Sequence, residues 1–299
     1  MLADTPSEAD LARRDLLAAV SDTPGSSKPD AILTVDKISR SFGGLKAVDV
    51  DHLEVQRGII TAFIGPNGAG KTTFFNLLTG FDTPDEGSWS FEGKELSGKA
   101  SHSIAQMGMV RTFQLTKSLG KMTVMDNMLL GAPKQRGEKL AFSLLRGTWR
   151  NQEREVRERA TELLERFNMI HMADEYAATL SGGQRKLLEM ARALMTKPSL
   201  ILLDEPMAGV NPALVQSLLG HVEALRDEGV SVLFVEHDMD VIMGISDWIV
   251  VLAEGSIIAE GTSAQVSKNP VVIDAYLGTE GGRAVGDGRS GRDGEEDEQ

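Results

Sequence analysis

Short hydrophobic segments alternate with helical patterns along the middle of the chain. The segments are often β-branched and cover residues 32–35, 59–64, 200–203, 230–235 and 249–252. Segments of this length and composition are typical of strands that are buried on both faces. Helical patterns follow several of them. This order predicts an α/β fold in which helices cover a mostly parallel sheet.

Residues 138–170 break this pattern. They are rich in charged residues, and their apolar positions recur at roughly helical spacing: Leu140, Leu144, Leu145, Trp149, Val156, Leu163, Leu164 and Phe167. One apolar face beside one charged face is typical of helices that pack on a core. We therefore predict a helical subdomain inserted into the α/β domain.

The two ends of the chain differ in composition from its middle. Residues 1–30 hold a short helical pattern over 11–20, followed by a stretch rich in Ser, Gly and Pro. Residues 281–299 hold almost no apolar side chains, so they bury too little surface to offset the entropy of ordering. We expect a disordered or loosely helical extension over 1–30, one folded domain over 31–280 and a disordered acidic tail over 281–299.

A glycine-rich loop follows the predicted strand 59–64. Residues 65–72 read GPNGAGKT and match the pattern G-x-x-x-x-G-K-[ST], with a helical run directly after them. In such a loop the backbone N–H groups and the helix N-terminus surround phosphate oxygens. Lys71 is predicted to neutralise the β and γ phosphates of a nucleotide, and Thr72 to bind Mg²⁺. The expected nucleotide-binding residues are Gly65, Pro66, Asn67, Gly68, Ala69, Gly70, Lys71, Thr72 and Thr73.

Two adjacent carboxylates, Asp204 and Glu205, follow the hydrophobic segment 200–203. Ligands of open α/β sheets bind at the carboxyl ends of the strands, where these two side chains emerge. Asp204 suits a place among the Mg²⁺ ligands. Glu205 suits a general base that polarises the water attacking the γ phosphate.

The most specific motif is Leu180-Ser181-Gly182-Gly183-Gln184, which a helical segment follows. It is the signature sequence of ABC-type ATPases, and the chain resembles that family over residues 31–280. Ser181 is predicted to cap a helix whose exposed N–H groups face a nucleotide held by another subunit. The glycines, which lack side chains, would let this nucleotide approach the helix end closely. The resemblance assigns Ser181, Gly182, Gly183 and Gln184 to nucleotide binding.

Three further residues take their roles from this resemblance. Gln114 is similar to the glutamine that touches Mg²⁺ and senses the membrane domain. His237 is similar to the histidine that contacts the γ phosphate, and Phe42 to the aromatic residue that stacks on adenine. The resemblance also implies the family's fold, which is a P-loop core with a mostly parallel sheet, an antiparallel β subdomain and a helical subdomain over about 115–195. The implied cofactors are ATP and Mg²⁺.

One departure from the family pattern points to a subfamily. Asn211 stands where many ABC ATPases carry an aspartate, and the segment 208–212 resembles the branched-chain amino acid uptake subfamily. Residues 110–127 and 260–278 resemble it as well. This resemblance implies import through transmembrane permease subunits, a second nucleotide-binding subunit and, indirectly, a solute-binding protein. A heterodimer is expected, with a homodimer as the alternative. Urea or another solute is the alternative cargo.

Composition narrows the remaining classes. The net charge of −13 argues against nucleic-acid binding, which depends on clustered Lys and Arg. No run approaches the roughly 18–20 apolar residues of a membrane span. Acidic residues at Asp4, Glu8 and Asp10 are unlike a secretory signal. The absence of cysteine excludes disulfides and thiolate metal sites. We expect a peripheral protein on the cytoplasmic face of the cell membrane.

Two other classes share part of these motifs. A non-transport ABC ATPase usually adds a long coiled coil, zinc-binding cysteines or a second cassette, and the sequence holds none of these. An ordinary P-loop switch or kinase has no role for the 180–184 signature. A transport ATPase is therefore the leading hypothesis.

Overall fold

The computed structural model describes residues 8–112, 119–133 and 150–281. Six strands form the central sheet in the order β10-β9-β3-β8-β7-β6, and neighbouring strands from β9 to β6 run parallel. Their bounds are β3 Ile60–Ile64, β6 Met109–Arg111, β7 Leu200–Asp204, β8 Ser231–Val235, β9 Trp248–Ala253 and β10 Ser256–Gly261. Strand β10 pairs antiparallel with β9 at one edge. The predicted α/β fold with a mostly parallel sheet is confirmed.

The central strands have apolar side chains on both faces because layers cover the sheet on both sides. Along β8, Val232 and Phe234 join the core beneath the helices, whereas Leu233 and Val235 join the core between the two sheets. Strands β3 and β7 alternate in the same way. Full burial explains why these strands appear in the sequence as continuous apolar segments.

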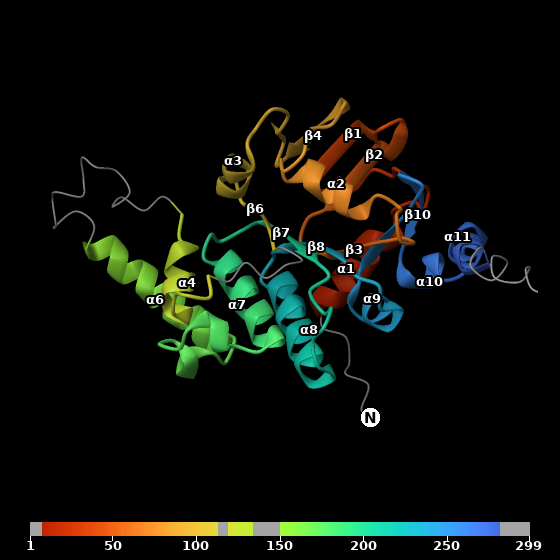
Figure 1. The fold of residues 1–299 in the computed structure, drawn as a ribbon. Helices are drawn as coiled ribbons and strands as arrows, with labels where there is room; N and C mark the ends of the chain where they lie inside the picture. The colour runs from red at the N-terminus through yellow and green to blue at the C-terminus, as the bar shows by residue number, and fades with distance from the viewer. Residues whose placement is uncertain (1–7, 113–118, 134–149, 282–299) are drawn as a thin grey trace, which may run out of the picture.

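A second, antiparallel sheet has the strand order β2-β1-β4-β5 (Figure 1). Its strands are β1 Ala31–Phe42, β2 Leu45–Gln56, β4 Glu86–Phe91 and β5 Lys94–Glu95. Helix α2, Lys71–Leu78, lies between the two sheets, and Phe74 stacks on Phe63 of β3 at 4.9 Å between ring centres. The antiparallel subdomain thus covers one face of the central sheet.

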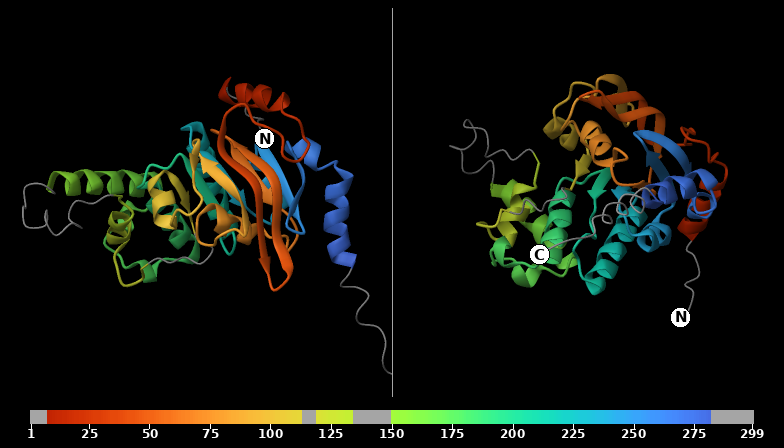
Figure 2. Two further views of the ribbon diagram at one scale, coloured as in Figure 1. Left: turned by 90° about the horizontal axis from the view of Figure 1, so that it is seen from above. Right: turned by 45° about the vertical axis from the view of Figure 1, so that its right-hand side comes forward.

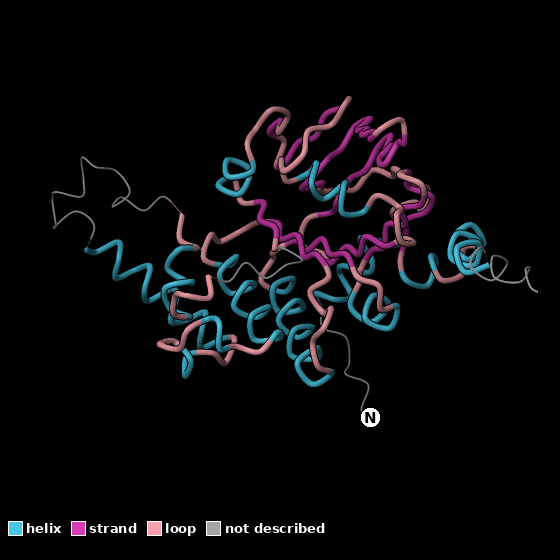
Figure 3. Tube along the Cα trace, in the orientation of Figure 1, coloured by secondary structure: helices cyan, strands magenta, loops and turns pink. Residues whose placement is uncertain are grey.

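Helices cover the other face of the central sheet, as the tube in Figure 3 shows. They are α7 Gly182–Leu194, α8 Pro212–Asp227 and α9 Met239–Ile245. Between β6 and β7 the described elements are helical: α4 Val124–Leu130, α6 Arg150–Arg166, the 3₁₀ turns η2 Ile170–Met172 and η3 Ala177–Thr179, and α7. Helix α6 projects away from the sheets (Figure 2). The remaining helices are α1 Glu8–Ala18, α3 Ser101–Gln106, α10 Ser263–Val266 and α11 Pro270–Gly281.

The N-terminal extension packs on the domain more closely than the sequence analysis expected. Leu17 and Val20 are buried in the core between the sheets. Lys28 forms an ion pair of 2.9 Å with Glu260, and both side chains are almost fully shielded from solvent. These contacts join segments far apart in the chain, so local composition gave no sign of them. Most of the predicted tail, 282–299, lies outside the described residues.

Among the described residues, no helix combines the length and the apolar character needed to cross a membrane.

Candidate active site

The glycine-rich loop between β3 and α2 lies against the backbone of two other strands. Gly65 has φ +154°, and a Cβ there would lie 2.0 Å from the carbonyl oxygen of Leu252. Gly70 has φ +99°, and its Cβ would lie 2.1 Å from the carbonyl oxygen of Ala47. Backbone atoms cannot move away cheaply, so both positions require glycine. The close approach of Leu252 and Ala47 therefore explains why the loop needs glycine at these two positions of the motif.

Lys71 begins helix α2 and folds back across this loop. Its ammonium donates hydrogen bonds to the carbonyl oxygens of Gly65 at 2.7 Å and Pro66 at 3.0 Å. Burial lowers the pKa of Lys71, and the nearby carboxylates of Glu205 and Asp204 act in the opposite direction. The loop, the ammonium and the acidic pair are therefore close neighbours. Asn67 and Gly68, in the middle of the loop, are exposed to solvent.

Asp204 ends strand β7 and is buried, with a 3% exposed surface. Its Oδ2 accepts a hydrogen bond of 2.6 Å from Arg111, whose guanidinium also donates to Asn76 of α2 at 2.6 Å. The other oxygen, Oδ1, has no hydrogen-bond partner within the described part of the chain. A buried carboxylate oxygen without a partner fits a cation ligand, because Mg²⁺ prefers carboxylate and hydroxyl oxygens. The donor set of Asp204 and Thr72 is therefore suited to Mg²⁺.

Glu205 and His237 meet in space. His237 Nε2 lies 2.7 Å from Glu205 Oε1, and Glu205 has a backbone φ of +48°. Both side chains are partly open to solvent. A carboxylate in contact with an imidazole beside a phosphate loop can accept a proton from water and pass charge to a neighbouring group. This pair was predicted residue by residue, but its direct contact was not.

Three charged residues around this pair escaped the sequence analysis. Lys186 of α7 donates to the carbonyl oxygen of Glu205 at 2.6 Å. Glu236 accepts hydrogen bonds from the backbone N–H of Met207 at 2.7 Å and of His237 at 3.3 Å. Burial raises the pKa of Glu236, and these two hydrogen bonds oppose the shift. Arg111 is the third. For Glu236 the sequence held a signal of a role in the site, because this residue directly follows a buried strand.

The signature segment caps helix α7. Ser181 accepts a hydrogen bond from the Gln184 N–H at 3.2 Å, and the Ser181 N–H donates to the Gln184 side chain at 2.9 Å. Ser181 and Gly182 are exposed. Gly183 is buried, and a Cβ there would lie 2.2 Å from Leu214 Cδ2 of α8. Gly183 therefore has a packing role between two helices that the sequence analysis did not include.

No hydrogen bond or ion pair among the described residues joins Ser181 or Gln184 to the loop 65–73. Within the described part of the chain, the signature segment and the phosphate loop are therefore not joined by a direct bond.

Asn211 caps helix α8, since its side chain accepts a hydrogen bond from the Leu214 N–H at 2.9 Å.

Phe42 lies at the end of β1 and is 48% exposed, which excludes the core position that a phenylalanine would otherwise favour. The guanidinium of Arg40 lies 4.8 Å from its ring centre. An exposed aromatic face at the end of a strand is able to stack on a base. Gln114 lies outside the described residues.

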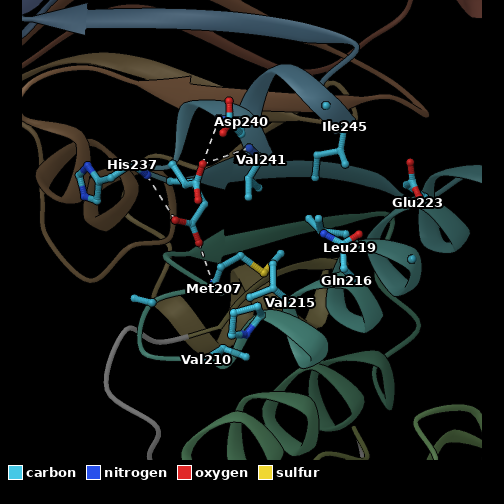
Figure 4. Close-up of a pocket in the computed structure, with 16 residues that line it drawn as sticks. Met207, Val210, Val215, Gln216, Leu219, Glu223, His237, Asp240, Val241 and Ile245 are labelled. Carbon is cyan, nitrogen blue, oxygen red and sulfur yellow. Dashed lines mark hydrogen bonds between the residues drawn. The ribbon is translucent and has the colours of Figure 1, made fainter. Parts of the chain in front are cut away.

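A cavity of about 810 Å³ opens beside His237, between α8 and α9 (Figure 4). The backbone N–H groups of His237 and Met207 both donate to the carboxylate of Glu236, at the edge of this cavity. Leu219, Val241 and Ile245 line the apolar part. The cavity therefore borders His237 on one side.

The fold and this site together define an ATPase of the ATP-binding cassette class. A P-loop cassette with a capped signature helix, a carboxylate pair at the end of β7 and a histidine after β8 has the parts that this chemistry needs. The comparisons with known proteins agree. The family model described as ABC transporter matches residues 48–208, and the model described as branched-chain amino acid ATP-binding cassette transporter matches residues 256–282. The chain belongs to the ABC transporter family, in its branched-chain amino acid branch.

Relatives in this branch match nearly their whole length. The chain is 46% identical over 249 residues to a protein of Archaeoglobus fulgidus named as the probable branched-chain amino acid transport ATP-binding protein LivG, covering 83% of this chain and 96% of the relative. It is 43% identical to BraF of Pseudomonas aeruginosa, named as a high-affinity branched-chain amino acid transport ATP-binding protein, with coverage of 83% and 98%.

Solved structures agree on the fold. An ATP-binding cassette of an ABC transporter in its ADP conformation has a TM-score of 0.72 at 40% identity, covering 83% of this chain and 99% of that one. CbiO1 of Clostridium perfringens, part of the ABC transporter complex CbiONQ, has a TM-score of 0.68 at 25% identity. The chain is thus an ATP-binding, ATP-hydrolysing subunit of an ABC transporter.

Proposed function

We propose that the chain hydrolyses ATP to drive the import of branched-chain amino acids. The observation that carries this proposal is the match of residues 256–282 to the branch-specific family model. Relatives at 41–46% identity are named for the same cargo. Transmembrane permease subunits would supply the path, and a solute-binding protein would deliver the amino acid. The chain would act as a peripheral subunit on the cytoplasmic face of the membrane.

The phosphate side of the site supports tight ATP binding. Phe42 is available to stack on adenine, and the N–H groups of the loop and the Lys71 ammonium, which here binds loop carbonyl oxygens, would bind the phosphates. Thr72, Asp204 and Gln114 are the proposed Mg²⁺ ligands, and the unpaired Oδ1 of Asp204 supports this assignment. When bound, Mg²⁺ neutralises charge on the β and γ phosphates. Thr73, Asn67 and the adjacent loop residues complete the cradle.

The hydrolytic step falls to Glu205 and His237. Glu205 accepts a proton from water as the water oxygen bonds to the γ phosphorus, and the bond to the bridging β–γ oxygen breaks to release ADP. His237 contacts Glu205 at 2.7 Å and so holds the carboxylate in the site. The same imidazole is proposed to contact the γ phosphate. Lys71 stabilises the negative charge on the transferred group.

The second half of each site is proposed to come from another subunit. Ser181 and Gly182 are exposed at the N-terminus of a 13-residue helix and are not joined to their own phosphate loop. Such a helix end favours an anion, so Ser181, Gly182, Gly183 and Gln184 would meet ATP held by a second nucleotide-binding subunit. We propose a heterodimer, and a homodimer is the alternative.

Uptake by cells that lack this protein tests the cargo. We expect labelled leucine uptake to fall and to return when the wild-type chain is supplied, but not when the Glu205→Gln chain is supplied. Labelled urea uptake is the matched control and should not change. Unchanged leucine uptake together with lost urea uptake would move the chain to the urea-type alternative.

A further inference from the structure

Glu205 has a backbone conformation that its neighbours must hold. Its φ of +48° lies in the left-handed region, which is uncommon for a residue with a Cβ. Such a conformation costs free energy and persists where surrounding contacts fix it. At Glu205 it directs the side chain toward His237. The contacts that fix this backbone therefore decide where the proposed base lies.

Two charged side chains supply contacts on either side of the strained residue. The ammonium of Lys186 donates to the Glu205 carbonyl oxygen at 2.6 Å, and the Ala208 N–H donates to the same oxygen at 3.2 Å. Two residues after Glu205, the Met207 N–H donates to Glu236 Oε1 at 2.7 Å. The Glu205 N–H itself donates to Val235 of β8 at 3.0 Å. The turn is thus tied to α7 and to the end of β8.

Glu236 links this turn to the histidine. Its second oxygen, Oε2, accepts from the His237 N–H at 3.3 Å, and the residue is only 5% exposed. One buried carboxylate therefore joins the backbone after Glu205 to the backbone of His237. Because each carboxylate oxygen accepts from one of these backbone N–H groups, Glu236 fixes the distance between the two segments. The backbone segments that carry Glu205 and His237 therefore share one partner.

Lys186 places the same turn under the influence of the signature helix. It lies in α7, the helix that Ser181 caps. A displacement of α7 would therefore move the ammonium that binds the Glu205 carbonyl. Burial lowers the pKa of Lys186, and the facing carboxylates of Glu236, Glu205, Glu189 and Asp204 oppose this shift. These acids surround the lysine from three elements of the domain.

We propose that Lys186 and Glu236 are positioning residues that hold Glu205 and His237 in their hydrolytic arrangement and make it depend on the position of helix α7. The proposal rests on the proposed role of Glu205 as the base. Contact of Ser181 with a nucleotide on the second subunit would then reach the base through one helix and one side chain. Neither residue needs to touch ATP.

Steady-state ATPase kinetics of the full chain separate positioning from binding. Lys186→Met removes the donor, and we expect kcat to fall by roughly 10-fold to 100-fold, because small misplacements of reacting groups have effects of this size. The KM for ATP should change by less than about twofold, since the ground-state contacts with ATP are kept. Lys186→Arg restores a charged donor and should recover part of kcat. Glu236→Gln removes one of two acceptors and should also lower kcat.

Two matched variants serve as controls. Lys197→Met removes an exposed lysine just after α7, and Glu223→Gln neutralises a carboxylate of the same cavity. Both should retain wild-type kcat. Thermal melting of each variant checks folding. If Lys186→Met does not fold, Glu236→Gln takes its place in the series.

Combination with Glu205→Gln tests whether the two residues act through the base. In that background the base is already lost, so Lys186→Met should lower kcat by less than about twofold further. Losses that multiply in full would overturn the proposal, as would a wild-type kcat for both Lys186→Met and Glu236→Gln. A Glu205→Gln chain that hydrolyses ATP normally would instead overturn the proposed function. The two failures are therefore distinguishable.

Discussion

The imidazole Nε2 of His237 lies 2.7 Å from Oε1 of Glu205, although the two residues are 32 positions apart in the chain. Each follows a neighbouring parallel strand, β7 or β8, so their meeting results from strand order. The carboxyl ends of parallel strands lie at one edge of the sheet, where ligands of such folds bind. This contact places Glu205, the proposed base, next to His237, which is proposed to bind the γ phosphate.

The first prediction concerns the base. Glu205→Gln keeps an acceptor for His237 but cannot take a proton, so we expect ATP turnover to fall by roughly 10²-fold to 10⁴-fold. ATP binding should persist, and the variant should accumulate as an ATP-bound dimer in size-exclusion chromatography. Glu254→Gln, at a turn with the same φ of +48°, is the matched control. Hydrolysis close to the wild-type rate would refute the assignment.

The second prediction concerns the two half-sites. Lys71→Ala should weaken nucleotide binding on its own chain, and Ser181→Arg should block the site that its chain completes on another. Mixing the two variants restores one intact composite site in a mixed dimer, so ATPase activity should recover in part. Affinity tags of two kinds on the two chains verify that mixed dimers form. Formation of mixed dimers without any recovery would contradict the shared arrangement.

The third prediction concerns stability at mildly acidic pH. Burial lowers the pKa of His221, and the charge of Arg166 acts in the same direction, while the ring of Phe167 lies 4.2 Å from the imidazole centre. The unfolded chain therefore binds a proton more readily than the folded chain below the ordinary pKa of about 6.5. Stability contributed by neutral His221 is present above this pH and is lost as the pH falls through it.

Replacement of the histidine isolates this effect. Urea unfolding at pH 7.5 and pH 5.5 should show a smaller loss of stability for His221→Gln than for the wild-type chain. His102→Gln, an exposed histidine on α3, is the matched control and should leave the pH dependence unchanged. An identical pH dependence for wild type and His221→Gln would contradict the prediction.

The fourth prediction concerns the N-terminal extension. Lys28 pairs with Glu260 at 2.9 Å, and Trp248 and the Ser26 N–H donate to the same carboxylate. Lys28→Met leaves a buried carboxylate without its counter-ion, which should lower the free energy of unfolding by about 3 kcal/mol, the low end for such pairs because two donors remain. Chemical denaturation measures this change.

An exposed pair supplies the comparison. Lys46 and Asp49 are 2.7 Å apart but open to solvent, so Lys46→Met should change stability far less than Lys28→Met does. Equal effects for Lys28→Met and Lys46→Met would show that the extension adds nothing to the domain. Loss of stability for Lys28→Met alone would make residues near 28 an integral part of it.

Several features of this protein could be predicted because their geometry is local. The loop 65–72 needs glycines, a lysine and a following helix within a short stretch, and Ser181 with Gln184 caps a helix over three residues. Central strands buried on both faces give continuous apolar segments, which is why the strand containing Asp204 was predicted. The long antiparallel strand β2 was not found by pattern, since polar positions interrupt its buried apolar residues.

Only the tertiary structure decided the contacts between distant segments. Arg111 meets Asp204 across 93 positions, and Lys28 meets Glu260 across 232. Lys186 reaches the Glu205 carbonyl because α7 lies beneath β7, and nothing in the sequence near residue 186 indicates that partner. Residue types and periodicity specify a strand, a cap or a loop through neighbouring positions. Partners of buried charges depend on strand order and helix placement, which the whole core sets through long-range packing.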